Sequence, residues 1–315
     1  MGHVAFIFVQ LFLSIAGANI RQFFEMTKTF SKYFYNFMYL IVFQKNRQIL
    51  TISISGEWFV GSRIFVFLYL QQDKHMLQKT KGIIIRAVKY SDAAWVVTVY
   101  TESFGRESYM VYGVNKKKSA FRAAYLQPLT LVEMNVEHVP GKELQRIKDV
   151  QTHIPLNEIP TNPVKNTIAL FLSEVLFKTL RLSEPDEQLY AYLENSIQLL
   201  EHSKKGIANF HLLFLMKLTR YLGFEPNNEN TDRTCFDLMN GVFLSEKPLH
   251  AHYLLHDDAQ YFGKLMSTPF TAIENLMLDR QRRNRIISQL MDYYRLHISG
   301  FSGVNSVEVL HELFD

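Results

Sequence analysis

Between residues 81 and 154, hydrophobic and polar residues alternate in short runs. The runs read KGIIIRAVKY, AWVVTVYTES, RESYMVYGV, LQPLTLVEMNVEHV and LQRIKDVQTHI. This approximate period of two indicates strands, and Ser91-Asp92 and Phe104-Gly105 supply turn signals between the first three. Five short strands so close together predict a closed five-stranded barrel of the OB type over residues 76–156.

The period changes after Pro155, Pro160 and Pro163. The runs NTIALFLSEVLFKTL, DEQLYAYLENSIQLL and ANFHLLFLMKLTRYLGF place apolar residues three and four apart, which predicts three helices that pack together. Asn162 before Pro163 is typical of a helix N-terminus, and Gly223 is typical of the residue after a helix C-terminus.

The rest of the chain alternates between a polar loop and further helices. NNENTDRTCFDLMNGVFLSEKPLH is rich in turn residues and predicts a loop with a small hairpin at Asn240-Gly241. Helical patterns return in TAIENLMLDRQRRNRIISQLMDYYRLHI and VNSVEVLHELF. The expected fold class is α+β multidomain, with the OB barrel followed by an all-helical domain over residues 157–315.

Residues 1–75 are rich in Phe and Tyr and follow neither period. An apolar run ending in Ala16-Gly17-Ala18 resembles a secretory signal but has no Lys or Arg before it. The later apolar pieces NFMYLIVF and SRIFVFLYL are too short to span a bilayer. We expect that Met76 is the natural start and that residues 1–75 come from an overextended reading frame. A membrane-proximal extension on an envelope-associated protein is the alternative.

Composition narrows the class of protein. Cys235 is the only cysteine, which excludes an internal disulfide and favours a reducing compartment, so a cytoplasmic location is expected. Lys and Arg outnumber Asp and Glu by 9 to 3 over residues 76–130, whereas residues 131–315 hold 18 against 24. A basic module joined to an acidic body favours a polyanionic partner for the module.

An OB barrel binds single-stranded nucleic acid with a positive groove and aromatic faces. The basic residues available are Lys79, Lys81, Arg86, Lys89, Arg106, Lys116, Lys117, Lys118 and Arg122, and the aromatic ones are Tyr90, Trp95, Tyr100, Phe104, Tyr109 and Tyr112. Trp95 and Phe104, which lie next to turns, are the preferred stacking residues. The alternatives are a solvated turn for the lysines of GVNKKKSAFRAAYLQP and ordinary packing for the rings.

A competing reading is a metal-dependent hydrolase. The stretch HAHYLLHDD holds His250, His252, His256, Asp257 and Asp258, and alternate residues on a strand point the same way, so they can share an ion. The sequence has no GxxxxGK[ST], GxGxxG, HExxH or GxSxG motif to support an ATPase, a zinc protease or a serine hydrolase.

From Met76 onward the sequence resembles the bacterial DNA repair protein RecO family. The matching features are a G-I-I-I-R strand from Gly82, a Y-S-D turn at Tyr90, a hairpin ending at Gly105-Arg106, the lysine-rich connection after Gly113 and an L-Q-P-L strand start at Leu126. LTRYLGFEP, FDLMNGVF and SVEVLHELF are similar to the family's helical C-terminal region. The resemblance covers about residues 76–315.

The resemblance implies a non-catalytic recombination mediator without cofactor or small-molecule substrate. Such a protein binds single- and double-stranded DNA, anneals complementary strands, pairs with RecR and helps load RecA onto DNA covered by single-strand-binding protein, so it would be nucleoid-associated. Many members carry a four-cysteine zinc site. Here only Cys235 stands in the corresponding region, about residues 225–250, so we expect the zinc to be lost and the loop to be held by packing.

Two sets of site residues follow from the resemblance. The phosphate contacts are assigned to Lys81, Arg86, Arg106, Lys116, Lys117, Lys118 and Arg122. Docking of the acidic C-terminal tail of single-strand-binding protein is assigned to Arg280, Arg282, Arg283 and Arg285. A solvated helix face is the alternative for these four arginines.

Overall fold

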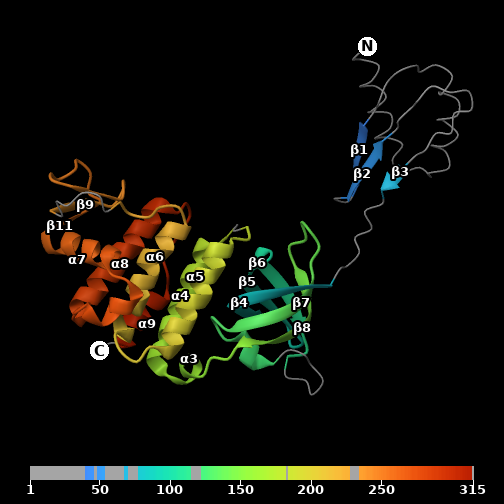
Figure 1. The fold of residues 1–315 in the computed structure, drawn as a ribbon, viewed down its shortest axis with the longest axis horizontal. Helices are drawn as coiled ribbons and strands as arrows, with labels where there is room; N and C mark the ends of the chain where they lie inside the picture. Colours follow the sequence, from blue (N-terminus) through green and yellow to red (C-terminus); the bar gives the residue numbers. More distant parts are fainter. Residues whose placement is uncertain are drawn as a thin grey trace, which may run out of the picture. The chain divides into compact units, whose positions relative to one another are not determined.

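The protein divides into two compact units, Met1–Lys74 and His75–Asp315. The computed structural model describes residues 40–45, 48–53, 67–69, 77–114, 122–181, 184–227 and 234–313. In the first unit, an antiparallel sheet has the strand order β1 (Leu40–Lys45), β2 (Gln48–Ser53) and β3 (Phe67–Tyr69) (Figure 1). The expected signal-like run that ends at Ala18 lies outside the described residues, and the expected start at Met76 stays a prediction.

The second unit begins with the predicted barrel. Its strands are β4 (Leu77–Lys89), β5 (Ala94–Thr101), β6 (Gly105–Tyr112), β7 (Leu131–Glu137) and β8 (Gln145–Ile154). They close in the order β4-β5-β6-β8-β7, with β6 and β8 parallel and the other pairs antiparallel. A short 3₁₀ helix, η1 (Ala123–Leu126), precedes β7. The five-stranded OB-like barrel is confirmed.

Alternation along β4 explains both the barrel interior and its contact with the helices. Ile84 points into the barrel core, whereas Ile83 and Ile85 point outward and are buried by the helical part. A β-bulge between Ile84 and Arg86 then shifts the register. Gly82 faces the interior, where a Cβ atom would lie 2.6 Å from Val99 Cγ1, so the barrel requires a glycine there.

The helical part is an assembly of seven α-helices within the described residues. They are α3 (Glu158–Thr161), α4 (Pro163–Thr179), α5 (Glu187–His202), α6 (Phe210–Tyr221), α7 (His256–Ser267), α8 (Arg280–His297) and α9 (Ser306–Leu313). Two 3₁₀ helices, η2 (Ile207–Asn209) and η3 (Phe270–Asn275), lie between them. Among the described residues, none of the helices has the length and apolar character needed to cross a membrane.

The predicted helix ends are confirmed by their hydrogen bonds. The Asn162 side chain accepts from the backbone N–H groups of Val164 and Lys165 at 3.0 and 3.3 Å, which caps α4. Gly223 follows α6 with φ +83°, and the Phe224 N–H donates to the Thr219 carbonyl at 3.0 Å. This is a Schellman ending, which favours glycine at that position.

The turn-rich region folds into a small sheet with the strand order β10-β9-β11. Its strands are β9 (Cys235–Asp237), β10 (Val242–Leu244) and β11 (Tyr253–Leu255). The predicted hairpin at Asn240-Gly241 joins β9 to β10. The helix α7 was not predicted from the sequence, although Ala259, Phe262 and Leu265 are buried at helical spacing.

Beside the core inside the barrel, a second hydrophobic core joins the outer barrel face to the helices. Tyr100 of β5 is fully buried, and its ring stacks 6.4 Å from that of Tyr190 on α5. His153 of β8 pairs with Glu194 of α5 at 3.1 Å. Figure 1 shows α4 and α5 beside the barrel. One end of the outer barrel face is therefore covered by helices, and the other end carries the exposed residues described next.

Candidate nucleic-acid interface

The outer face of β4, β5 and β6 carries two exposed tyrosines. The Tyr90 N–H donates to the Ala94 carbonyl at 2.9 Å, and Ala94 is the cross-strand partner of Tyr112. Tyr90 is 72% exposed and Tyr112 is 61% exposed, whereas Ala94 between them is only 4% exposed. Neighbouring strands place the two tyrosine Cα atoms about 10 Å apart. The barrel thus presents two rings on either side of a small residue.

An apolar row lies next to these tyrosines. Val88, Val96 and Met110 are cross-strand neighbours, and Val88 is 44% exposed. The following row holds Arg86 and Thr98. Exposed apolar groups gathered on one face, with cations beside them, are typical of a binding surface.

Trp95 and Phe104, the two aromatic residues that the sequence favoured for base stacking, do not lie on this exposed outer face. Trp95 and Phe104 are only partly exposed and pack against the barrel core. The Phe104 ring also stacks on His138 with their centroids 4.1 Å apart. Local turn position favoured these two residues, but strand parity turns Trp95 inward. Among the described residues of the barrel, Tyr90 and Tyr112 are instead the aromatic residues with exposed side chains.

Much of the charge on the outer face of β7 and β8 is locally neutralised. Lys79 pairs with Glu133 at 2.9 Å, and Lys148 pairs with Glu137 at 2.9 Å. Lys81 is half-buried beside Glu133 in the β4–β7 register. A nucleic-acid strand would therefore meet less net positive charge on the outer face of β7 and β8 than on the outer face of β4, β5 and β6.

The lysine-rich connection starts directly after β6. Lys116, Lys117 and Lys118 lie outside the described residues, so their assignment stays a prediction. The flanking residues are described: Val114 follows two positions after Tyr112, and Arg122 is exposed before η1. Chain connectivity alone ties the lysines to the end of the strand that carries Tyr112.

Arg86 and Arg106 converge on α4. Each guanidinium carbon lies 4.5 Å from the ring centroid of Phe177, a cation–π distance. Arg106 Nη1 also donates to the carbonyl oxygens of Phe177 and Leu180 at 2.8 and 3.2 Å. Arg106 therefore holds the C-terminus of α4 to the barrel, a role that the sequence did not indicate.

The four arginines at the start of α8 lie on two faces of the helix. Arg280 donates to the His311 carbonyl at 3.3 Å, and Arg283 donates to the Leu278 carbonyl at 2.6 Å. These two bind neighbouring parts of the chain. The expected tail-docking cluster is thus divided, with Arg282 and Arg285 on the other face.

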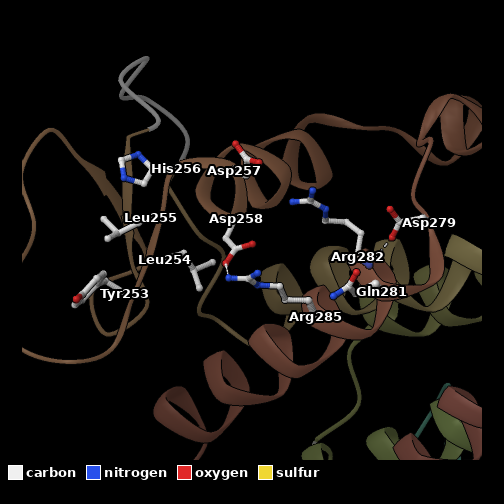
Figure 2. A pocket seen from close by; sticks show the side chains of 10 residues that line it. All are labelled: Tyr253, Leu254, Leu255, His256, Asp257, Asp258, Asp279, Gln281, Arg282 and Arg285. Atoms are coloured by element: carbon white, nitrogen blue, oxygen red, sulfur yellow. Dashed lines mark hydrogen bonds and ion pairs between the residues drawn. The ribbon is translucent and has the colours of Figure 1, made fainter.

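Arg282 and Arg285 line a pocket of about 570 Å³ between α7, α8 and β11. Its lining also includes Asp257, Asp258 and Asp279. Figure 2 shows Arg285 reaching Asp258, an ion pair of 2.6 Å, and the Arg282 side chain extending into the space beside it. The pocket therefore offers charges of both signs next to the apolar residues of β11.

The histidine cluster is dispersed by the fold. His250 Nε2 lies 3.3 Å from Asp237 Oδ2, His252 is exposed, and His256 begins α7. Among the described residues, no three His, Cys, Asp or Glu side chains are arranged to hold a metal ion. The hydrolase hypothesis requires several of these side chains on one face of a strand, but the start of helix α7 at His256 separates them.

The region about residues 225–250 does not fit a four-cysteine zinc site. Cys235 is buried, and burial followed by the nearby Asp237 charge raises the pKa of its thiol, which opposes the thiolate form that binds zinc. The Asp237 carboxylate instead accepts from the backbone N–H groups of Met239 and Asn240 at 2.8 and 3.2 Å. The Phe236 ring lies 4.7 Å from that of Phe262. Hydrogen bonds and packing hold the described part of this region from Cys235 onward.

Comparison with known proteins agrees with these features. The family model described as "Recombination protein O N terminal" matches residues 76–155, and the one described as "Recombination protein O C terminal" matches residues 160–303. The DNA repair protein RecO of Azobacteroides pseudotrichonymphae is 39% identical over 241 residues, which are 76% of this chain and 100% of the relative.

Other relatives show the same coverage. The DNA repair protein RecO of Phocaeicola vulgatus is 38% identical over 240 residues, and that of Porphyromonas gingivalis is 30% identical over 245 residues. In both cases the match spans 76% of this chain and 100% of the relative. The chain therefore belongs to the RecO family of DNA repair and recombination proteins, which are non-catalytic recombination mediators.

Proposed function

We propose that this chain binds single-stranded DNA across the outer face of β4, β5 and β6, and that it anneals complementary strands. The observation that carries this proposal is the exposed pair Tyr90 and Tyr112 on either side of Ala94. Each exposed ring offers a face on which a base can stack, and base stacking on aromatic rings tolerates any sequence.

The cations supply the second part of the interface. Lys116, Lys117 and Lys118 follow closely after Tyr112 in the chain, and Arg122 is exposed at the other end of the connection. Phosphate contacts release counterions and make the affinity depend on salt. Neutralising phosphates on two strands lowers the repulsion that opposes their pairing. Duplex DNA would bind through the same backbone contacts.

Replacing Lys116, Lys117 and Lys118 with alanine tests the proposal. Loss of three phosphate contacts should reduce the slope of log K against log salt by about 2 for single strands, and annealing of complementary oligonucleotides should slow. Fluorescence titrations over a salt series measure the slope. The matched control replaces Lys204, Lys205 and Lys264, which are exposed in the helical part. A slope equal to that of the unchanged protein would reject the lysine assignment.

The partners of this chain in recombination are inferred from its membership of the RecO family. We infer that the chain pairs with RecR and helps to load RecA onto DNA coated with single-strand-binding protein. Annealing by residues 76–315, measured with and without single-strand-binding protein on the oligonucleotides, tests this role as a whole. Annealing that the coating protein abolishes would contradict a mediator function.

We place docking of the acidic tail of single-strand-binding protein at the pocket of Arg282 and Arg285. A terminal carboxylate can replace Asp258 as the partner of Arg285 while Arg282 binds a second acidic group. The Arg282→Ala variant should bind a tail peptide about 3- to 10-fold more weakly in an anisotropy titration. Arg295→Ala, near the other end of α8, is the control. If the Arg282→Ala and Arg295→Ala variants bind the tail peptide with equal affinity, the tail does not dock at this pocket.

A further inference from the structure

Cations from the barrel and from the helical part meet at one seam. Arg86 and Arg106 lie over the same Phe177 ring at 4.5 Å, so the two guanidinium carbons are within twice that distance of each other. Arg106 also binds the Leu180 carbonyl, and the next residue in the chain is Arg181. Three arginines from β4, β6 and the end of α4 thus gather around the C-terminus of one helix.

These three arginines lack carboxylate partners. Among the described residues, neither Arg86 nor Arg106 nor Arg181 forms an ion pair, although Arg181 donates to the Gly300 carbonyl at 3.1 Å. Burial, followed by the charges of Arg181 and Arg86, lowers the pKa of Arg106. Like charges held this close favour an anion between them.

A carboxylate of the adjoining pocket, Glu174, is already engaged. A pocket of about 360 Å³ adjoins the seam and is lined by Arg86, Phe177, Glu174 and Lys178, among others. Glu174 accepts from the backbone N–H groups of Asn305 and Ser306 at 3.0 and 2.9 Å and pairs with Lys178 at 3.0 Å. Its charge is therefore satisfied by the backbone N–H groups at the N-terminus of α9 and by Lys178, so Glu174 does not act as a counter-ion for the arginines.

We propose that this seam, formed by Arg86, Arg106 and Arg181, binds phosphodiester groups of a nucleic-acid strand that continues from the barrel face toward the helical part. The identity of the ligand rests on the proposed function. Arg86 lies four residues before Tyr90, which directly follows β4. This separation is about 13 Å, so a strand stacked on the tyrosines reaches the seam after a few nucleotides. The new element is Arg181, which brings the helical part into contact with DNA.

The chemistry of the three side chains suits phosphate oxygens. Arg86 and Arg181 are exposed, and Arg106 uses only Nη1 for the carbonyls of α4, so Nε and Nη2 remain as donors. A guanidinium can give two parallel hydrogen bonds to one phosphate, and several of them can follow consecutive phosphates. A strand bound here would contact both parts of the unit at once.

The test varies the length of the DNA. Binding of oligothymidylates of about 3 nucleotides, which end before Arg181 when stacked on the tyrosines, is compared with binding of oligothymidylates of about 20 nucleotides. Arg181→Ala should weaken the longer strand about 3- to 10-fold and lower its salt slope by about 0.7, and it should leave the shorter strand unchanged. Arg181→Lys should keep the slope, because it keeps the charge.

Two controls make the outcome decisive. Arg220→Ala removes an exposed cation elsewhere in the helical part and should change neither length, and thermal unfolding checks that Arg181→Ala keeps its fold. If Arg181→Ala binds the longer strand as tightly as the unchanged protein does, or loses the same affinity for both lengths, the proposed phosphate site at the seam is wrong. If Arg181→Ala acts as expected but the triple-lysine variant binds both lengths normally, the lysine assignment fails and the seam stands.

Discussion

Replacing Tyr90 and Tyr112 together with alanine should weaken single-stranded DNA binding at least 30-fold. Each exposed ring offers a stacking surface worth about 1–3 kcal/mol per base, so loss of both costs about 2–6 kcal/mol. Stacking involves no counterion release. The slope of log K against log salt should therefore stay the same while K falls, which is the opposite of the result expected for the lysines.

The conservative pair of substitutions is the control for this experiment. Tyr90→Phe with Tyr112→Phe keeps both ring faces and removes only the hydroxyl groups, so binding should stay close to that of the unchanged protein. Both side chains are exposed, and their removal should leave the barrel folded. If the alanine variant binds as tightly as the phenylalanine variant, bases do not stack on this face.

Replacing Glu201 with leucine should lower the free energy of unfolding by about 3–5 kcal/mol. The Glu201 carboxylate is buried and accepts from the backbone N–H groups of Asn157, Glu158 and Ile159 at 2.6, 2.7 and 2.9 Å. Lys165 donates to the Glu201 carbonyl oxygen at 2.6 Å. Leucine would leave three N–H groups without an acceptor and would remove a carboxylate charge near the buried Lys165 ammonium, at the junction of α3, α4 and α5.

The effect should depend on pH. Burial by itself would raise the pKa of Glu201, but the three N–H groups and the Lys165 charge outweigh it and lower the pKa below its ordinary value. A depressed pKa means that the carboxylate stabilises the fold fully above the pKa of the unfolded chain, about 4.3, and that this stability is lost as pH falls through the folded pKa.

Urea unfolding at neutral pH and below about pH 4 measures this difference. The gap in stability between the unchanged protein and Glu201→Gln should be large at neutral pH and should shrink in acid. Glu184→Gln, at an exposed position before α5, should show no gap at either pH. A gap that does not change with pH would mean that the carboxylate charge contributes nothing.

Local signals explain how much of the fold was predictable. Strand alternation and apolar spacing depend on neighbouring residues, so the five barrel strands and the helices α4, α5, α6, α8 and α9 were visible. The cap at Asn162 and the ending at Gly223 also act within a few residues. The short helix α7 was missed because it has few apolar positions and begins in a cluster of polar residues.

The candidate site was less predictable, because exposure depends on contacts between distant residues. Trp95 and Tyr90 are both aromatic and both lie near a turn, and only the closed barrel decides which ring is packed and which is free. Arg106 contacts Phe177, 71 residues later in the chain. The number of basic residues does not show which cations bind a neighbouring helix and which are available to bind a ligand.

The sequence by itself determined the order of the elements, the basic character of the barrel and the family, because periodicity, charge and motifs are properties of the chain. The tertiary structure decided which outer face stays free, since α4 and α5 cover one end of it and leave Tyr90 and Tyr112 exposed at the other. It also brought Arg181 to Arg86 and Arg106, because only packing of α4 on the barrel joins segments so far apart in the chain.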